Sequence, residues 1–91
     1  MQEYKYLNDM RVLKIRFTEH ITKSGSKFTM EYKGLFKWKR NTVMVGGSFA
    51  GIVYDDIQGD TKEQCLDINL RHMRLCKDYI RIIEFSTIKS Y

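Results

Sequence analysis

The chain has 91 residues, of which 43% are hydrophobic and 30% are charged, and its formal net charge is +5. This length allows one domain with a modest core, which buries roughly 60–65% of the surface that the unfolded chain exposes. The composition argues against intrinsic disorder, and no apolar run approaches the ~20 residues of a membrane span. We therefore expect residues 1–91 to form a single compact domain, with residues 1–10 as a candidate flexible N-terminal arm.

The N-terminal sequence and the cysteines both favour a cytoplasmic protein. Residues 1–10, M-Q-E-Y-K-Y-L-N-D-M, lack the apolar stretch of a signal peptide. Cys65 and Cys76 fall in one expected helix, about 16 Å apart along its axis. A disulfide needs Cα atoms within about 7 Å, so we expect both cysteines to be reduced core residues. The absence of proline and the abundance of Lys, Ile and Tyr resemble small proteins from AT-rich genomes, including bacteriophages.

In chain order, the first expected element is a strand. In residues 11–20, R-V-L-K-I-R-F-T-E-H, apolar and polar side chains alternate, which is typical of a half-buried strand. Residues 22–27, T-K-S-G-S-K, form a turn cluster. Residues 28–40, F-T-M-E-Y-K-G-L-F-K-W-K-R, then form a second strand that pairs with the first as an antiparallel hairpin.

Along that second strand, the aromatic side chains and the lysines alternate in sequence. The aromatic residues have even numbers and the lysines odd ones, so a straight strand would place them on opposite faces. We expect Phe28, Tyr32 and Phe36 in the core. Because a twelve-residue strand would be unusually long, Gly34 is expected to be a bend or bulge.

Further strands and one helix follow. Residues 42–54 are interrupted by glycines and predict two short strands or one strongly bulged strand, and residues 55–60 a loop. A helix is expected from about residue 61 to 77, capped by Asp60 or Thr61. Residues 79–88 are a last strand with apolar side chains on both faces, which indicates a central strand or a covered edge.

These elements predict an α+β fold. Four to five antiparallel strands, in the order β-β-β(β)-α-β, form a sheet with one amphipathic helix packed on its apolar face. The apolar arc of the helix spans about 220°, wider than packing on one sheet requires. Another surface could therefore cover the rest of this arc. A polar residue at a symmetric helix–helix interface can fix how the two helices align. We therefore expect a homodimer, with an interface of Leu66, Asn69, Leu70, His72 and Met73; the alternative is that the polar members are buried and bonded to backbone.

The basic residues predict a nucleic-acid-binding face. With apolar side chains inward, the lysines of both strands point to the open face of the sheet and can neutralise phosphates. The alternative is a solvated face whose lysines protect an edge from aggregation. Trp38, near the end of the second strand, is the aromatic residue whose exposure would add base stacking. The candidate binding residues are Lys14, Arg16, Lys27, Lys33, Lys37, Trp38, Lys39 and Arg40.

For three other groups of residues we favour a structural role over ligand binding. G-G-S-F-A-G, residues 46–51, could cradle a phosphate, but a strand rather than a helix is expected to follow it, so a bulge or turn is the better interpretation. The acidic residues 55, 56, 60 and 63 lack calcium-loop spacing. His72 and Cys76 could chelate zinc, but Cys65 lies more than ~10 Å away along the helix axis and nothing positions His20 as a third ligand.

No nucleophile and base stand at catalytic spacing, so we expect neither an enzyme nor a cofactor or metal.

Residues 59–70, G-D-T-K-E-Q-C-L-D-I-N-L, resemble the strand-to-helix junction of HicB-type antitoxin domains. The shared content is mostly a capping box before an amphipathic helix, which many α+β domains have, so no functional residue is transferred.

The function expected from the sequence is non-enzymatic binding of RNA or single-stranded DNA through the basic face. The alternative is a protein-interaction module, such as a phage-type inhibitor or an antitoxin-like adaptor, which the wide helix arc and the two-faced last strand favour. Binding of a small nucleotide near residues 46–51 is a third option.

Overall fold

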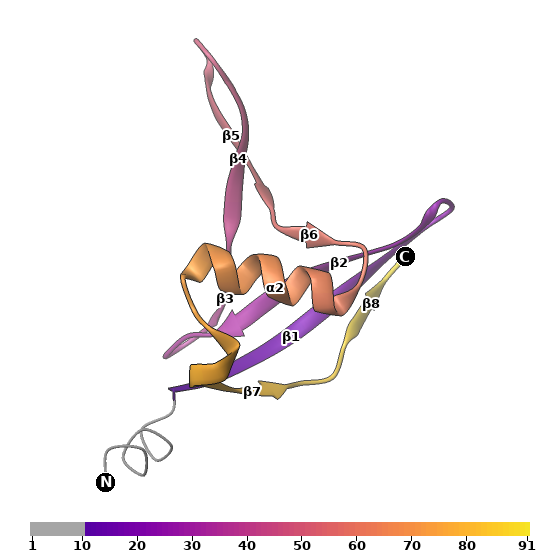
Figure 1. The fold of residues 1–91 in the computed structure, drawn as a ribbon. Coiled ribbons are helices and arrows are strands. Elements are labelled where there is room, and N and C mark those ends of the chain that lie inside the picture. Colours follow the sequence, from indigo (N-terminus) through magenta and orange to yellow (C-terminus); the bar gives the residue numbers. More distant parts are fainter. Residues whose placement is uncertain (1–10) are drawn as a thin grey trace, which may run out of the picture.

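The computed structural model describes residues 11–91, in which one helix covers a mixed sheet and a separate hairpin projects from it (Figure 1). The helices are α2 (Lys62–Met73) and the 3-10 helix η1 (Lys77–Tyr79). The strands are β1 (Arg11–Thr22), β2 (Gly25–Lys33), β3 (Trp38–Arg40), β4 (Thr42–Ser48), β5 (Gly51–Asp56), β6 (Gln58–Gly59), β7 (Ile80–Glu84) and β8 (Ile88–Ser90). The expected N-terminal arm lies outside the described residues.

The α+β class is confirmed, but the prediction of a purely antiparallel sheet of four to five strands is wrong. The main sheet has six strands in the order β3-β2-β1-β7, with β6 also beside β2 and β8 beside β1. Both β7 and β8 run parallel to β1. Because β6 is antiparallel to β2, it runs parallel to β1, and α2 reverses the chain once more. A strand that follows such a crossover helix returns in the same direction as the strand before it.

The core lies between α2 and one face of this sheet. Leu13, Ile15 and Phe17 alternate along β1 and are all buried, as the period of two predicts. Met30 lies opposite Phe17 in the register of β1 and β2. The buried cluster comprises Leu13, Ile15, Phe17, Met30, Cys65, Leu70 and Ile80. We call the sheet side toward α2 the helix face and the other side the open face.

Local hydrogen bonds fix both ends of α2. The Thr61 hydroxyl accepts a hydrogen bond from the Gln64 N–H at 3.1 Å, so the predicted cap is confirmed. The helix ends at Met73, earlier than expected, because Arg74 adopts the left-handed conformation with φ 58°. The Leu75 N–H then bonds to the Leu70 carbonyl at 2.9 Å, which is the closing bond of a Schellman motif.

Three further expectations differ from the structure. Phe36 is 92% exposed, because it lies in the turn between β2 and β3 rather than in a continuous strand. Cys76 is exposed, since it follows the end of α2. The last strand, predicted as one element over residues 79–88, is divided into β7 and β8, and of its two predicted positions β7 takes the edge of the main sheet rather than the centre.

Gly59 of β6 lies close to the first turn of α2. A Cβ atom at this position would lie 2.5 Å from the Cys65 nitrogen and 2.8 Å from its Cα. The contact is with backbone, which cannot rotate away as the end of a flexible side chain can. Glycine is therefore the residue that allows β6 to lie directly against the first turn of α2.

Burial of Cys65 predicts a stability change at alkaline pH. Desolvation raises the pKa of this thiol to about 11 from an ordinary value of 9.0. Between these two pH values the unfolded chain loses the thiol proton and the folded chain keeps it, so the free energy of unfolding falls as pH rises. We expect wild type to lose about 2 kcal/mol more than Cys65→Ala between pH 9 and 11, as measured by urea unfolding. Equal slopes in the two proteins would contradict this pKa.

Candidate nucleic-acid interface

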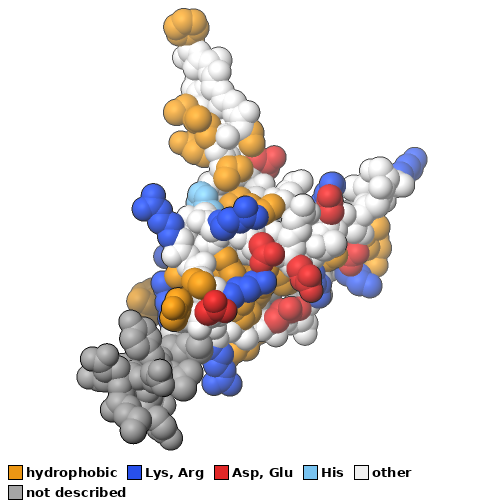
Figure 2. Space-filling model, in the orientation of Figure 1, with side chains coloured by type: hydrophobic (Ala, Val, Ile, Leu, Met, Phe, Trp, Pro, Cys, Tyr) orange, Lys and Arg blue, Asp and Glu red, His pale blue; other side chains and the backbone are white. Residues whose placement is uncertain are grey.

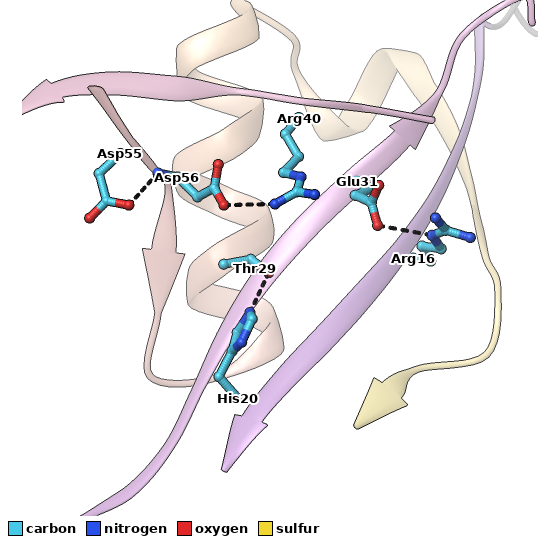
Figure 3. Close-up of polar contacts among 7 residues, drawn as sticks. All are labelled: Arg16, His20, Thr29, Glu31, Arg40, Asp55 and Asp56. Carbon is cyan, nitrogen blue, oxygen red and sulfur yellow. Dashed lines mark hydrogen bonds and ion pairs between the residues drawn. The ribbon is translucent and has the colours of Figure 1, made fainter. Parts of the chain in front are cut away.

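A hollow of about 400 Å³ lies on the open face of the sheet. Strands β1, β2 and β3 contribute cations and the single tryptophan, and the segment from residue 85 to 88 contributes the opposite wall. We call this the basic hollow, defined by Lys14, Arg16, Lys33, Trp38, Phe85, Ser86 and Ile88. None of these residues is acidic. In Figure 3, α2 lies behind the strands, and the side chain of Arg16 lies in front of them.

The turn between β2 and β3 brings Trp38 to the same face as the cations. The Gly34 N–H donates to the Lys37 carbonyl at 2.8 Å, so the chain folds back here. Lys33 and Trp38 then become direct partners in the antiparallel register. Residues opposite each other in such a pair share a face. In a straight strand their odd separation would have placed them on opposite faces, as the sequence predicted.

Trp38 is held by its neighbours on this face. The Arg16 guanidinium carbon lies 4.3 Å from the centroid of the indole, and the Lys33 ammonium nitrogen lies 5.6 Å from it. Phe85 meets the indole edge to face, with ring centroids 5.4 Å apart and an interplanar angle of 81°. These are ordinary geometries for cation–π and T-shaped aromatic contacts. The hollow therefore holds an aromatic ring that is packed between two cations and a second aromatic side chain.

Ion pairs neutralise part of the open face. Arg16 donates from Nε to Glu31 at 3.1 Å, and Arg40 donates from a terminal nitrogen to Asp56 at 3.0 Å (Figure 3). The bond to Asp56 raises the pKa of Arg40 above its ordinary value. Lys14 and Lys33 have no acidic partner within residues 11–91. Among the cations of the hollow, these two lysines are therefore the ones without an ion pair in the part of the chain that the structure describes.

The other predicted binding residues lie outside the basic hollow. Lys27 shares the open face with His20 in the β1–β2 register, but it forms an ion pair with Asp60. Lys37 lies in the turn after β2. Lys39 is paired with Tyr32 and so lies on the helix face. The structure thus gathers Lys14, Arg16, Lys33 and Trp38 and places the remaining candidates elsewhere.

The hydrophobic wall of the hollow was not identified from the sequence. Phe85 and Ile88 are each 45% exposed, and Ile88 pairs with Thr18 on the open face. The pattern of apolar residues on both parities of residues 79–88 could have indicated them. By itself, that pattern predicts a central or covered strand and not the wall of a hollow.

The residues predicted for a dimer interface on α2 have different environments. Asn69 is 1% exposed and Leu70 is 3% exposed, whereas His72 is exposed and Leu66 and Met73 are partly buried. Asn69 donates to the Cys65 carbonyl at 2.8 Å and accepts from the Asn41 amide at 3.0 Å. The bond from Asn41 ties α2 to the residue between β3 and β4, and the bond to Cys65 lies within α2.

The glycine-rich segment and His20 do not line the basic hollow of the described residues. Residues 46–51 span the end of β4, the turn at residues 49–50 and the start of β5, so of the predicted bulge or turn the structure shows a turn; the register of the hairpin shifts just before this segment, between Met44 and Gly46. His20 contacts the Thr29 hydroxyl at 2.9 Å. Within residues 11–91, no three His, Cys, Asp or Glu side chains are grouped to hold a metal ion. In the same part of the chain, no helix is both long and apolar enough to cross a membrane.

Comparison with known proteins does not supply a family. No family model matches the chain, and neither the curated proteins nor the solved structures include a significant match to it. Any inference about function therefore depends on the geometry of residues 11–91.

Proposed function

We propose that the protein binds RNA or single-stranded DNA in the basic hollow and that it does so without catalysing a reaction. The observation that supports this most is the position of Trp38 beside Lys14, Arg16 and Lys33 on one face. Proteins that bind single strands combine a positively charged groove with aromatic rings on which bases stack. Both requirements have to be met on the same surface, and here they are.

In the hollow, different residues are suited to binding phosphate and to stacking with a base. Lys14 and Lys33 have no acidic partner within residues 11–91, so they are suited to phosphate. Arg16 is oriented by Glu31 on one side and by the Trp38 ring on the other. A guanidinium plane held in this way can support a base, as an aromatic side chain does. The base therefore stacks on the Arg16–Trp38 pair while the lysines hold the backbone on either side.

A single strand fits the hollow better than a duplex. A volume of about 400 Å³ suits one flipped-out or unpaired nucleotide. Stacking on the Arg16–Trp38 pair needs an unpaired base, because paired bases are enclosed in the helix stack. We therefore expect a preference for oligo(U) or oligo(dT) over duplex of the same length.

Trp38 provides a direct readout of binding because it is the one tryptophan of the 91-residue sequence. We expect oligo(U) or oligo(dT) to quench its fluorescence, with affinity falling as salt rises, because phosphate contacts release counterions. Trp38→Phe should lose the signal but bind in a filter assay. Absence of quenching and of filter retention at about 50 mM salt would refute the proposal, since electrostatic binding is strong under those conditions.

A protein-interaction module, such as a phage-type inhibitor or an antitoxin-like adaptor, is the second candidate function. It is favoured by the exposed apolar side chains of Ile83, Phe85 and Ile88, which lie next to the cations of the hollow. An acidic protein segment with apolar residues would suit the same surface. If wild type gave neither quenching nor filter retention with oligo(U) or oligo(dT), and Ile83→Ser abolished biological activity, this candidate would replace nucleic-acid binding.

A further inference from the structure

The hairpin formed by β4 and β5, which we call the hairpin arm, is separate from the main sheet. Its two strands pair with each other and, within the described residues, with no third strand. Figure 1 shows the arm projecting away from the helix and the main sheet. A two-stranded hairpin is marginally stable by itself in water. An arm of this length therefore needs another surface to hold it.

The hairpin arm is apolar and has no charged residue between Thr42 and Tyr54. In Figure 2 its distal part carries hydrophobic side chains and no charged ones, in contrast to the body of the molecule. Six large side chains are 57% to 114% exposed, namely Met44, Val45, Phe49, Ile52, Val53 and Tyr54. Phe and Tyr alone offer roughly 150–250 Å² each. Three of the six, Ile52, Val53 and Tyr54, lie along β5, so a partner strand beside β5 would cover part of this apolar area.

The charge and the open backbone edges of the arm indicate whether nucleic acid, lipid or protein covers it. Nucleic acid is disfavoured, because the arm has no cation to neutralise phosphate and carries Asp55 and Asp56 at its base. A lipid bilayer is disfavoured, because both strands have an open edge whose backbone groups would lose their hydrogen bonds in hydrocarbon. A protein strand can satisfy the edge and bury the apolar side chains together.

The two edges of the arm differ in their capacity to pair. The β4 edge is interrupted by the register shift between Met44 and Gly46. A bulge of this kind protects an edge from further pairing. The β5 sequence, G-I-V-Y-D-D, is regular, and its β-branched and aromatic residues favour strand pairing. The β5 edge is therefore the one that accepts another strand.

We propose that the β5 edge pairs with β5 of a second copy of this chain, antiparallel and about a two-fold axis at Val53. A two-fold axis perpendicular to a sheet requires one residue to lie opposite its own copy. Centring on Val53 places Ile52 opposite Tyr54 of the second copy. Asp55 then lies opposite Gly51 of the second copy, so no carboxylates face each other. The uncharged parts of the two arms, residues 42–54, meet in this way without the repulsion that bodies of net charge +5 would experience.

The pairing would join the two arms into one four-stranded sheet. On one face, the β4–β5 register already places Met44 beside Tyr54 and Gly47 beside Ile52. The dimer extends this into a continuous apolar row, in which Tyr54 of each copy meets Ile52 of the other. Aromatic and β-branched cross-strand pairs are favourable ones. Because the contact lies on the arms, it leaves both basic hollows free, and it is independent of the proposed function.

Cysteine cross-linking tests the register directly. In a Cys76→Ser background, Val53→Cys should form an intermolecular disulfide with oxidised glutathione, because directly opposite residues are about 4.5–5.5 Å apart. Ile52→Cys is the matched control, since its own copy lies diagonally beyond disulfide range. We expect a dimer on non-reducing gels at position 53 and not at position 52. Equal cross-linking at both positions, or none at position 53, overturns the proposal.

Sedimentation velocity provides the second test. Wild type should be a dimer, and Val53→Lys should be a monomer with an unchanged circular dichroism spectrum, because two like charges would face each other on an already exposed position. Ser48→Lys, on the other strand of the arm, and His72→Glu, on α2, should remain dimers. A monomeric wild type, or a dimer that His72→Glu dissociates and Val53→Lys does not, refutes pairing through β5.

Discussion

Replacing Gly59 with alanine is expected to lower the free energy of unfolding by about 3 kcal/mol, at the upper end of the cost of overpacking. The new Cβ atom would lie 2.5 Å from the Cys65 nitrogen, so β6 and α2 would have to separate. The helix cannot yield easily there, because the Cys65 N–H donates to the Thr61 carbonyl at 3.0 Å and Thr61 caps the helix. A 91-residue domain has a total stability of roughly 5–14 kcal/mol, so this loss is large.

Thermal unfolding is the measurement, and Gly46→Ala is its matched control. A Cβ atom at Gly46 would meet nothing within 4 Å. We expect Gly59→Ala to lower Tm by roughly 10–25 °C, since 1 kcal/mol shifts Tm by about 4–8 °C at this size. Gly46→Ala should leave Tm within a few degrees of wild type. Similar Tm values for both variants would show that β6 does not lie against α2 as described.

Reversing the charge of two lysines of the hollow, Lys14→Glu with Lys33→Glu, is expected to weaken binding of oligo(U) or oligo(dT) about 100-fold, on the order of 1.4 kcal/mol for each side chain. Both lysines line the basic hollow and lack an acidic partner within residues 11–91. Each therefore loses a phosphate contact and adds repulsion. The slope of log K against log salt should fall by about 1.4, because single strands contribute ~0.7 per phosphate contact.

A double variant with the same change in net charge provides the control. Lys23 lies exposed in the turn between β1 and β2, and Arg71 lies exposed on α2. Lys23→Glu with Arg71→Glu should keep nearly the wild-type affinity and slope. If both double variants weakened binding equally, the net charge of +5 rather than the hollow would account for the attraction.

The sequence predicted the elements whose pattern is local. Alternation of apolar residues along 11–20 identified β1 and its buried face, because a strand repeats every two residues. Thr61 with Gln64 identified the start of α2, because a cap is formed within one turn of the chain. The end of α2 was less predictable, since Arg74 in the left-handed region is not the glycine that usually marks such an end.

The composition of the candidate site depended on distant contacts and was only partly predictable. Lys14, Arg16 and Lys33 were identified as cations of the open face, but Phe85 and Ser86 reach the hollow from the other end of the chain. Sequence patterns do not show which strand will lie beside β1. That depends on the direction in which α2 returns the chain.

By itself, the sequence determined that rings and cations alternate in residues 28–40, and that Gly34 interrupts them. The tertiary structure decided on which face each lies. Because the chain folds back at Gly34, Trp38 pairs with Lys33 and joins the cations, while Phe36 is exposed in the turn. The alternation of side chains determines their faces only within one strand. After a turn, the face of each residue depends on how the two strands pair, and this pairing is not visible in the sequence pattern.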